Sequence, residues 1–227
     1  MIKILEKDSE KAVVASDMEI QLANAIRRSV NEIPILAIDE VDIHKNDSAL
    51  YDQILAHRIG LVPLKNQKSA GSLTLKTKGG EVLSGLLGKG VAYQDIPLVL
   101  LGKDQEIELV ARTKQGIGKD HSKFSPGLFY YRYLPKIEIS PEGEKHSELA
   151  ELYPRVFEFN GKLKVLDEKA CSLDNEDLSG FEGVNIKETG EIAIFIESWG
   201  QLEAGEIFAE SVKVLKDNLN ELSKSLK

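Results

Sequence analysis

The sequence contains little cysteine and little histidine, and this shortage excludes several classes of site. One cysteine, Cys171, and four histidines occur in 227 residues. A single cysteine cannot form an internal disulfide, and zinc or iron–sulfur sites built from thiolates need several cysteines. We therefore expect no disulfide framework, no zinc and no iron–sulfur cluster within this chain.

The sequence also lacks a long apolar run and an excess of positive charge. No segment approaches the roughly 18 apolar residues of a membrane-spanning helix, and residues 1–7 alternate like a strand rather than a secretory signal. The 29 Lys and Arg residues face 37 Asp and Glu residues, for a formal net charge of -8. Non-specific nucleic-acid binding depends on Lys and Arg that neutralise phosphates. We expect a cytoplasmic protein that does not enter a membrane or grip nucleic acid directly.

What is present is typical of a water-soluble globular protein. The chain is 42% hydrophobic and 29% charged, a balance found in folded domains. Its length is sufficient for a sizeable core in one or two domains.

An amphipathic helix is predicted after two short strands, 2–5 and 12–15. Asp17 is a plausible N-cap, and Arg27 and Arg28 would lie in the last turn, where cations suit the helix dipole. The apolar stripe recurs at helical spacing. Its members are Met18, Leu22, Ala25, Ile26 and Ser29.

A strand over 38–43 and a second helix through Ile59 are expected next. Residues 46–48 would cap that helix, Leu50, Ile54 and Leu55 would face inward, and Gly60 would end it. His57 and Arg58 stand in its last turn. A lone His–Arg pair there more often complements the dipole or contacts a partner than performs catalysis.

Short strands separated by glycine-rich turns predict a mainly antiparallel β region from Gly71 to Ile139. The expected strands are 72–76, 98–101, 106–111 and 133–139. We interpret this region as an insertion within the first domain.

The loop Gly116–Pro126 contains Gly-Ile-Gly-Lys-Asp-His-Ser-Lys. It is not a phosphate-binding P-loop, because Thr113 and Asp120 occupy positions that require Gly and Ser or Thr. Asp120 and His121 alone are weak evidence for a metal site. A basic surface loop is the favoured interpretation.

Residues 141–190 are polar and rich in turns. Asn160-Gly161 between the alternating runs 156–159 and 162–165 predicts a β-hairpin. A strand over 191–197 and a long closing helix follow. Apolar residues recur in this helix at spacings of 4, 3, 4, 3 and 4, a narrow seam suited to helix pairing. The seam consists of Phe208, Val212, Leu215, Leu219, Leu222 and Leu226. It could pack within the chain or against another helix.

Four motifs carry a resemblance to a known family. They are Leu-Ala-Asn-Ala-Ile-Arg-Arg at 22–28, the strand 38–43, Ala-His-Arg-Ile-Gly-Leu-Val-Pro-Leu at 56–64, and the loop 116–123 with the aromatic strand 127–133. In order and spacing they resemble the D-type assembly subunit of archaeal DNA-directed RNA polymerase. That family includes the eukaryotic third-largest subunit and, more distantly, the N-terminal half of the bacterial alpha subunit.

The resemblance implies an α+β fold and three segments. A dimerisation domain of short sheet and two long helices would be split between 1–44 and 190–227. A β-rich domain, 45–140, would be inserted in it. Residues 141–189 would form a reduced ferredoxin-like module, without a cluster because only Cys171 stands where relatives carry several cysteines.

The resemblance also implies a non-catalytic scaffold subunit of DNA-directed RNA polymerase. It would heterodimerise with subunit L through the stripe and the seam, and form a platform with subunits N and P for the large catalytic subunits. Further partner contacts are expected from Arg27, Arg28, His57, Arg58, Lys119, His121 and Lys123. Two alternatives stay open: a homodimeric module of the bacterial alpha type, and a stand-alone enzyme using His57 or His121 as a base.

Overall fold

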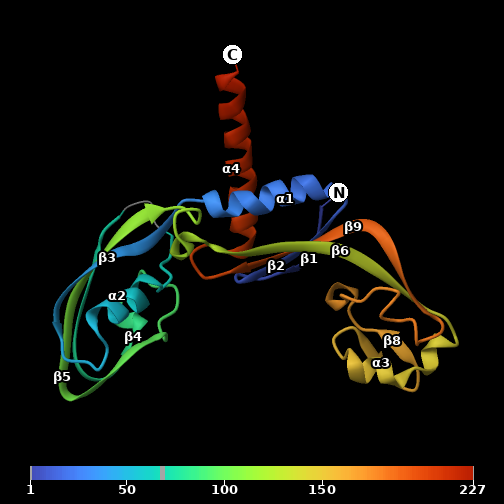
Figure 1. Ribbon diagram of the computed structural model, residues 1–227, viewed down its shortest axis with the longest axis horizontal. Coiled ribbons are helices and arrows are strands. Elements are labelled where there is room, and N and C mark those ends of the chain that lie inside the picture. The colour runs from blue at the N-terminus through green and yellow to red at the C-terminus, as the bar shows by residue number, and fades with distance from the viewer. Residues whose placement is uncertain (1, 67–69, 227) are drawn as a thin grey trace. The chain divides into compact units, whose positions relative to one another are not determined.

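The computed structural model describes residues 2–66 and 70–226 (Figure 1). The strands are β1 (Ile2–Lys7), β2 (Lys11–Ser16), β3 (Ile35–Asn46), β4 (Ser72–Leu83), β5 (Pro97–Gly116), β6 (Gly127–Ile139), β7 (Phe157–Phe159), β8 (Leu163–Val165) and β9 (Val184–Ser198). The helices are α1 (Ile20–Ser29), α2 (Asp52–Gly60), α3 (Ser147–Leu152) and α4 (Ala204–Ser225), together with short 3-10 turns. In the described part of the chain, no helix is long and apolar enough to cross a membrane.

In the residues that the structure describes, the strands form three sheets, and the chain divides into two compact units. The sheet orders are β1-β2-β9-β6, β3-β5-β4 and β7-β8. One unit comprises residues 1–5, 13–20 and 130–194, and the other 6–12, 21–129 and 195–227. The sequence prediction of a mixed fold with antiparallel pairing is confirmed by the β3–β5, β4–β5 and β7–β8 ladders.

The β3–β5–β4 sheet curves around α2 (Figure 1). Its core contains the fully buried side chains Leu55 and Ile59 of α2 and Leu109 of β5. One correction concerns β5, which is a single strand over Pro97–Gly116 rather than two. Register shifts on both of its partners, such as the one between Lys78 and Gly80 of β4, keep the long ladder paired through its bend.

The start of α2 also differs from the sequence prediction. The helix begins at Asp52, and Asn46 does not cap it: its side chain accepts from the Ser48 amide at 3.1 Å and donates to the Leu50 carbonyl at 2.9 Å, which orders the preceding turn instead. Ile54 is 48% exposed, contrary to expectation, because the buried line of α2 runs through Leu55 and Ile59. Leu55 is buried as predicted.

The segment between β6 and β9 has its own small core. Phe157, Leu149 and Leu163 are buried in it, and Cys171 is 2% exposed within the same cluster. The predicted hairpin is confirmed, since β7 pairs with β8 and Gly161 adopts a positive φ of 79° in the turn.

Strand β6 starts in close contact with neighbouring elements. A Cβ at Gly127 would collide with the Glu197 carbonyl of β9 and lie 3.0 Å from the Ile207 side chain of α4. Only glycine permits this approach of backbone to backbone. The first turns of α4 are therefore packed closely against the start of β6, which in turn contacts β9.

Candidate functional site

Helix α4 begins with a capping box. The Glu203 side chain accepts from the backbone of Glu206, and the Glu206 carboxylate accepts from the Glu203 amide at 3.1 Å. Ala204, Ile207 and Ser211 then face the core, and the Phe208 ring stacks on Phe129 with centroids 6.2 Å apart. These contacts hold the first turns of α4 firmly.

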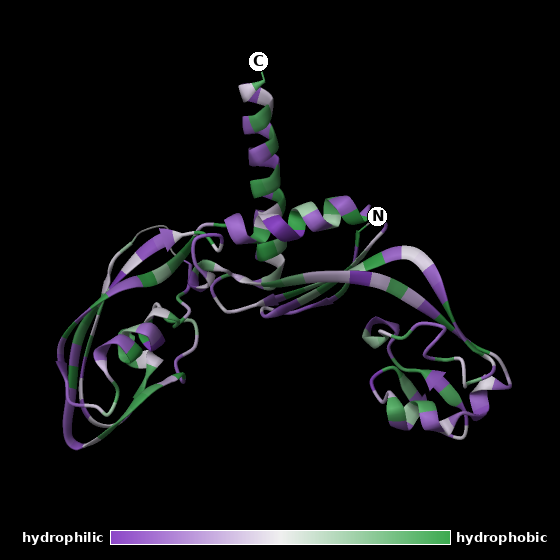
Figure 2. Ribbon diagram, viewed as in Figure 1, coloured by the Kyte–Doolittle hydropathy of each residue, from purple (hydrophilic) through white to green (hydrophobic). Residues whose placement is uncertain are grey.

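The rest of α4 extends into solvent. Every residue from Lys216 to Leu226 is exposed, and hydrophobic residues recur among hydrophilic ones along the ribbon (Figure 2). In the seam, Phe208 and Leu215 are half-buried, whereas Val212 is 39%, Leu219 58%, Leu222 57% and Leu226 79% exposed. An apolar row of this length on a free helix marks a surface that another element covers.

Helix α1 presents only part of the predicted stripe. Leu22 is 47% exposed, but Ile26 and Ser29 lie within the chain's own core at 4% and 3% exposure. The helix starts at Ile20, so Met18 precedes it and is half-buried, as is Ala25 within the helix. The buried face of α1 consists of Ala23, Ile26 and Ser29. It therefore includes Ala23, which the predicted stripe did not contain.

The two arginines at the end of α1 are exposed. The Arg27 guanidinium donates to Asn24 Oδ1 at 3.2 and 3.0 Å on the same helix. The predicted place of both arginines in the last turn of α1 is confirmed, where cations suit the helix dipole.

The lysines of the 116–126 loop bind within the chain. Lys119 Nζ lies 2.6 Å from Glu32 Oε1 and Lys123 Nζ lies 2.7 Å from Asp39 Oδ1. The Lys123 side chain is only 13% exposed, and its hydrogen bond lowers the pKa of the Asp39 carboxyl. Lys119 and Lys123 therefore attach this loop to η1 (Val30–Glu32) and to β3.

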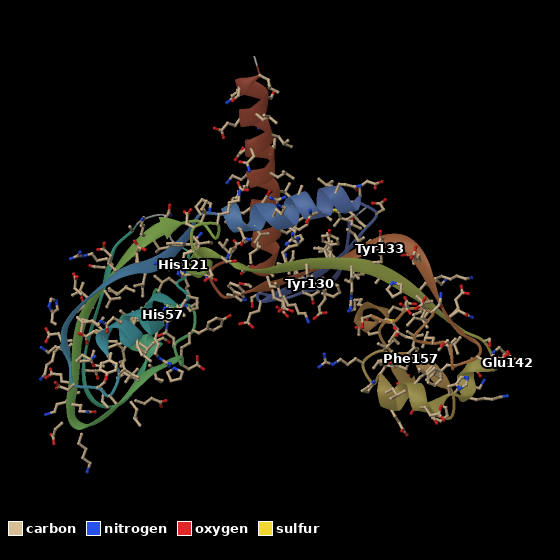
Figure 3. The ribbon with its side chains drawn as sticks, in the orientation of Figure 1. His57, His121, Tyr130, Tyr133, Glu142 and Phe157 are labelled. Carbon is tan, nitrogen blue, oxygen red and sulfur yellow. The ribbon has the colours of Figure 1, made fainter. Side chains whose placement is uncertain are left out.

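His57 of α2 and His121 of the loop after β5 are labelled in Figure 3. Both line one shallow pocket of about 300 Å³. His121 Nδ1 accepts from the Lys123 amide at 3.1 Å and thereby caps a short 3-10 turn. Asp39, the carboxylate in this pocket, is already paired with Lys123. The arrangement provides turn capping and an ion pair, with no nucleophile joined to a base.

Arg58 has a structural role that its place in the motif did not reveal. Its Nε donates to the Leu98 carbonyl at 2.8 Å and its Nη2 to the Pro97 carbonyl at 2.7 Å. Two bonds from one guanidinium fasten α2 to the start of β5.

Cys171, the one cysteine of the sequence, lies in the core of the segment between β6 and β9. Its side chain is buried among apolar residues, and burial raises the pKa of the thiol, which disfavours the thiolate that a metal requires. Among the residues that the structure describes, no three His, Cys, Asp or Glu side chains are grouped to hold a metal ion.

The structure also reveals a contact that the sequence analysis missed. Asn218 Nδ2 of α4 donates to Glu32 Oε2 at 2.8 Å, on the carboxylate that also binds Lys119. Hydrogen bonds from Lys119 and then Asn218 lower the pKa of the Glu32 carboxyl. The residues are 186 positions apart in sequence, and no local pattern signals such a pair.

Comparison with known proteins gives consistent matches. Residues 13–219 match the family described as RNA polymerase Rpb3/Rpb11 dimerisation domain. The chain is 35% identical to DNA-directed RNA polymerase subunit Rpo3 of Thermococcus kodakarensis, over 98% of this chain and 97% of that protein. It is 32% identical to Rpo3 of Methanothermobacter thermautotrophicus over 97% of each chain, and 33% identical to Rpo3 of Pyrococcus furiosus over 94% and 92%.

Proposed function

This chain belongs to the RNA polymerase Rpb3/Rpb11 dimerisation domain family, and from that we propose that it is a non-catalytic assembly subunit of an archaeal-type DNA-directed RNA polymerase. Relatives that match this chain over nearly their whole length are named DNA-directed RNA polymerase subunit Rpo3. No polymerase chemistry is assigned to its own residues. Its contribution to transcription is to hold other subunits together in the cytoplasm.

The observation that carries this proposal is the exposed seam of α4. Leu219, Leu222 and Leu226 are more than half exposed on a helix that leaves its own core. Burying each such side chain against a partner contributes about 1.5–3 kcal/mol before the entropic cost of association. We propose that the seam, with Leu22 of α1, pairs with the equivalent helices of subunit L.

The remaining surfaces are proposed to contact other subunits. The β-rich segment 45–140 would be an insertion in a dimerisation domain split between 1–44 and 190–227, and would form with subunits N and P the platform for the large subunits. His57, Arg27 and Arg28 are proposed contacts. Arg58, Lys119 and Lys123 are bonded within the chain, so they would shape contact surfaces rather than reach partners.

The segment 141–189 is proposed to act as a reduced module that holds neither a cluster nor zinc. Its buried apolar side chains, such as Phe157 and Leu149, support this, because they give the module a core of its own without a metal. The net charge of -8 supports a role without direct contact to nucleic acid.

The proposal is tested by co-expressing the chain with a candidate L subunit and measuring molar mass by light scattering after size exclusion. We expect a one-to-one heterodimer. Leu219→Asp together with Leu222→Asp should abolish it, because burying two carboxylates without partners costs several kcal/mol. His121→Ala is a variant outside the interface and should still pair.

Asn220→Asp is the matched control for the added charge, since Asn220 lies on α4 between these leucines but on another face. A wild-type chain that stays monomeric beside L would overturn the proposal. A stable homodimer without L would instead support a self-contained module of the alpha type.

A further inference from the structure

We infer that the Glu32 cluster, consisting of Glu32, Lys119 and Asn218, sets the orientation of the exposed half of α4 and so makes Glu32 and Asn218 positioning residues for subunit pairing. This inference rests on the proposed function, because it concerns how the seam is presented to its partner. It adds residues that lie outside the apolar interface itself.

Both oxygens of Glu32 are bound by segments distant in sequence. Lys119 Nζ, from the loop after β5, lies 2.6 Å from Oε1, and Asn218 Nδ2, from α4, lies 2.8 Å from Oε2. The Glu32 side chain is 23% exposed. One carboxylate therefore joins η1, the loop and α4 at a single point.

The loop is held against η1 by contacts that do not involve α4. The Lys119 amide donates to the Asn31 carbonyl at 3.1 Å, and Ser125 Oγ donates to Asn31 Oδ1 at 3.2 Å. A Cβ at Gly118 would lie 2.9 Å from the same Oδ1, so the loop and η1 are in close contact. Glu32 is thus held by Lys119 in a defined position, ready to accept from Asn218.

Helical phase places Asn218 on the inward line of α4. Ile207 and Ser211 are buried on that line, and Asn218 follows Ser211 by two turns. Leu215 and Leu219 lie on the adjacent line of the seam. A rotation of α4 by one residue, about 100°, would turn the seam away from the direction it now faces.

The hydrogen bond of Asn218 restrains the exposed part of α4, beyond the residues that pack on the core. Residues 216–226 are exposed, Leu215 is half-buried, and the last buried residue of α4 is Ser211. A hydrogen bond to a charged acceptor is stronger than one between neutral groups. Holding the helix in its pairing orientation reduces the conformational entropy lost when a partner binds.

The inference is tested by measuring the dissociation constant for a candidate L subunit with four variants: Asn218→Asp, Asn218→Ala, Asn220→Asp and one double variant. Asn218→Asp sets a carboxylate against Glu32 and should weaken pairing by about tenfold. Asn220→Asp, with the same added charge on another face, should stay within about twofold. The double variant Glu32→Gln, Asn218→Asp exchanges donor and acceptor and should recover most of the loss.

Hydrogen exchange gives the readout that distinguishes positioning from general destabilisation. In the free chain, Asn218→Asp should raise amide exchange in residues 212–225 while the thermal midpoint changes little. Asn218→Ala, which removes the donor without adding charge, should show the same pattern more weakly.

The outcomes separate this inference from the proposed function. If Asn218→Asp and Asn218→Ala both pair like the wild type while the seam variant with Leu219→Asp and Leu222→Asp does not, the positioning role is wrong and the scaffold role stands. Failure of the double variant to recover would also overturn the inference. If the seam variant pairs normally as well, the proposed interface fails.

Discussion

At the scale of single residues, charged side chains that the sequence analysis assigned to partner contacts form ion pairs within the chain. Lys123 is the clearest case, since its ammonium lies over the Phe124 ring at 5.1 Å and against Asp39. A cation beside an aromatic face and a carboxylate is stabilised by both. The lysines that make the loop basic therefore serve to attach it to β3 and η1.

The Asp39–Lys123 pair predicts a pH-dependent contribution to stability. Its partner lowers the pKa of Asp39, so the contribution is present above the ordinary carboxyl range near pH 4 and is lost as pH falls through the lowered value. Asp39→Asn should cost about 1 kcal/mol at pH 7 and progressively less toward pH 2. Urea unfolding at a series of pH values measures this.

Glu40→Gln is the control for that prediction. Glu40 neighbours Asp39 but its side chain is 67% exposed beside Arg112, so this variant should change stability little at any pH. Equal losses for Asp39→Asn at pH 7 and at pH 2 would contradict an ionic contribution.

At the scale of elements, the β6–β9 segment shows how a small module is held together by apolar packing. Cys171 is part of that core at 2% exposure, next to a short 3-10 turn, η5 (Glu168–Ala170), capped by Asp167. The side chain therefore fills space as a small hydrophobe.

Cys171 should consequently react as a buried thiol. Burial raises its pKa, so alkylation by iodoacetamide should be slow in the folded chain and fast after denaturation. Cys171→Ala should lower stability by about 1 kcal/mol, because it leaves a small void. Mass spectrometry of the alkylated protein and denaturant unfolding measure the two effects.

Metal analysis completes that test. The purified protein should contain far less than one iron per chain, before and after Cys171→Ala. Stoichiometric iron that disappears in the variant would show that this module holds a cluster after all.

At the scale of the whole molecule, charge and exposed apolar surface point to protein partners. The chain has a net charge of -8, while its exposed large hydrophobic residues include successive members of the α4 seam. Apolar burial drives association without needing phosphate contacts. The exposed apolar surface of α4 therefore favours binding to other protein subunits.

The net charge predicts weak binding to DNA. Duplex DNA of arbitrary sequence should give no saturable binding to the isolated chain below about 100 μM at physiological salt, at the weak end of the non-specific range. Fluorescence anisotropy measures this, with a basic protein of similar mass as the positive control. Tight, steeply salt-dependent binding would contradict the prediction.

The sequence by itself determined those features that depend on local chemistry. Periodicity predicted the α4 seam, Asn160-Gly161 predicted the β7–β8 turn, and residue spacing excluded a P-loop at 116–126. Each depends on residues within a few turns or a single hairpin, where spacing and backbone preference act directly.

Only the tertiary structure decided which apolar residues are free and where the charges pair. Ile26 and Leu22 lie on one predicted stripe, yet one is buried and the other 47% exposed, because burial depends on which distant strands pack beneath the helix. Asn218 and Glu32 meet across 186 residues. Their contact follows from the path of the whole chain, which no local pattern contains.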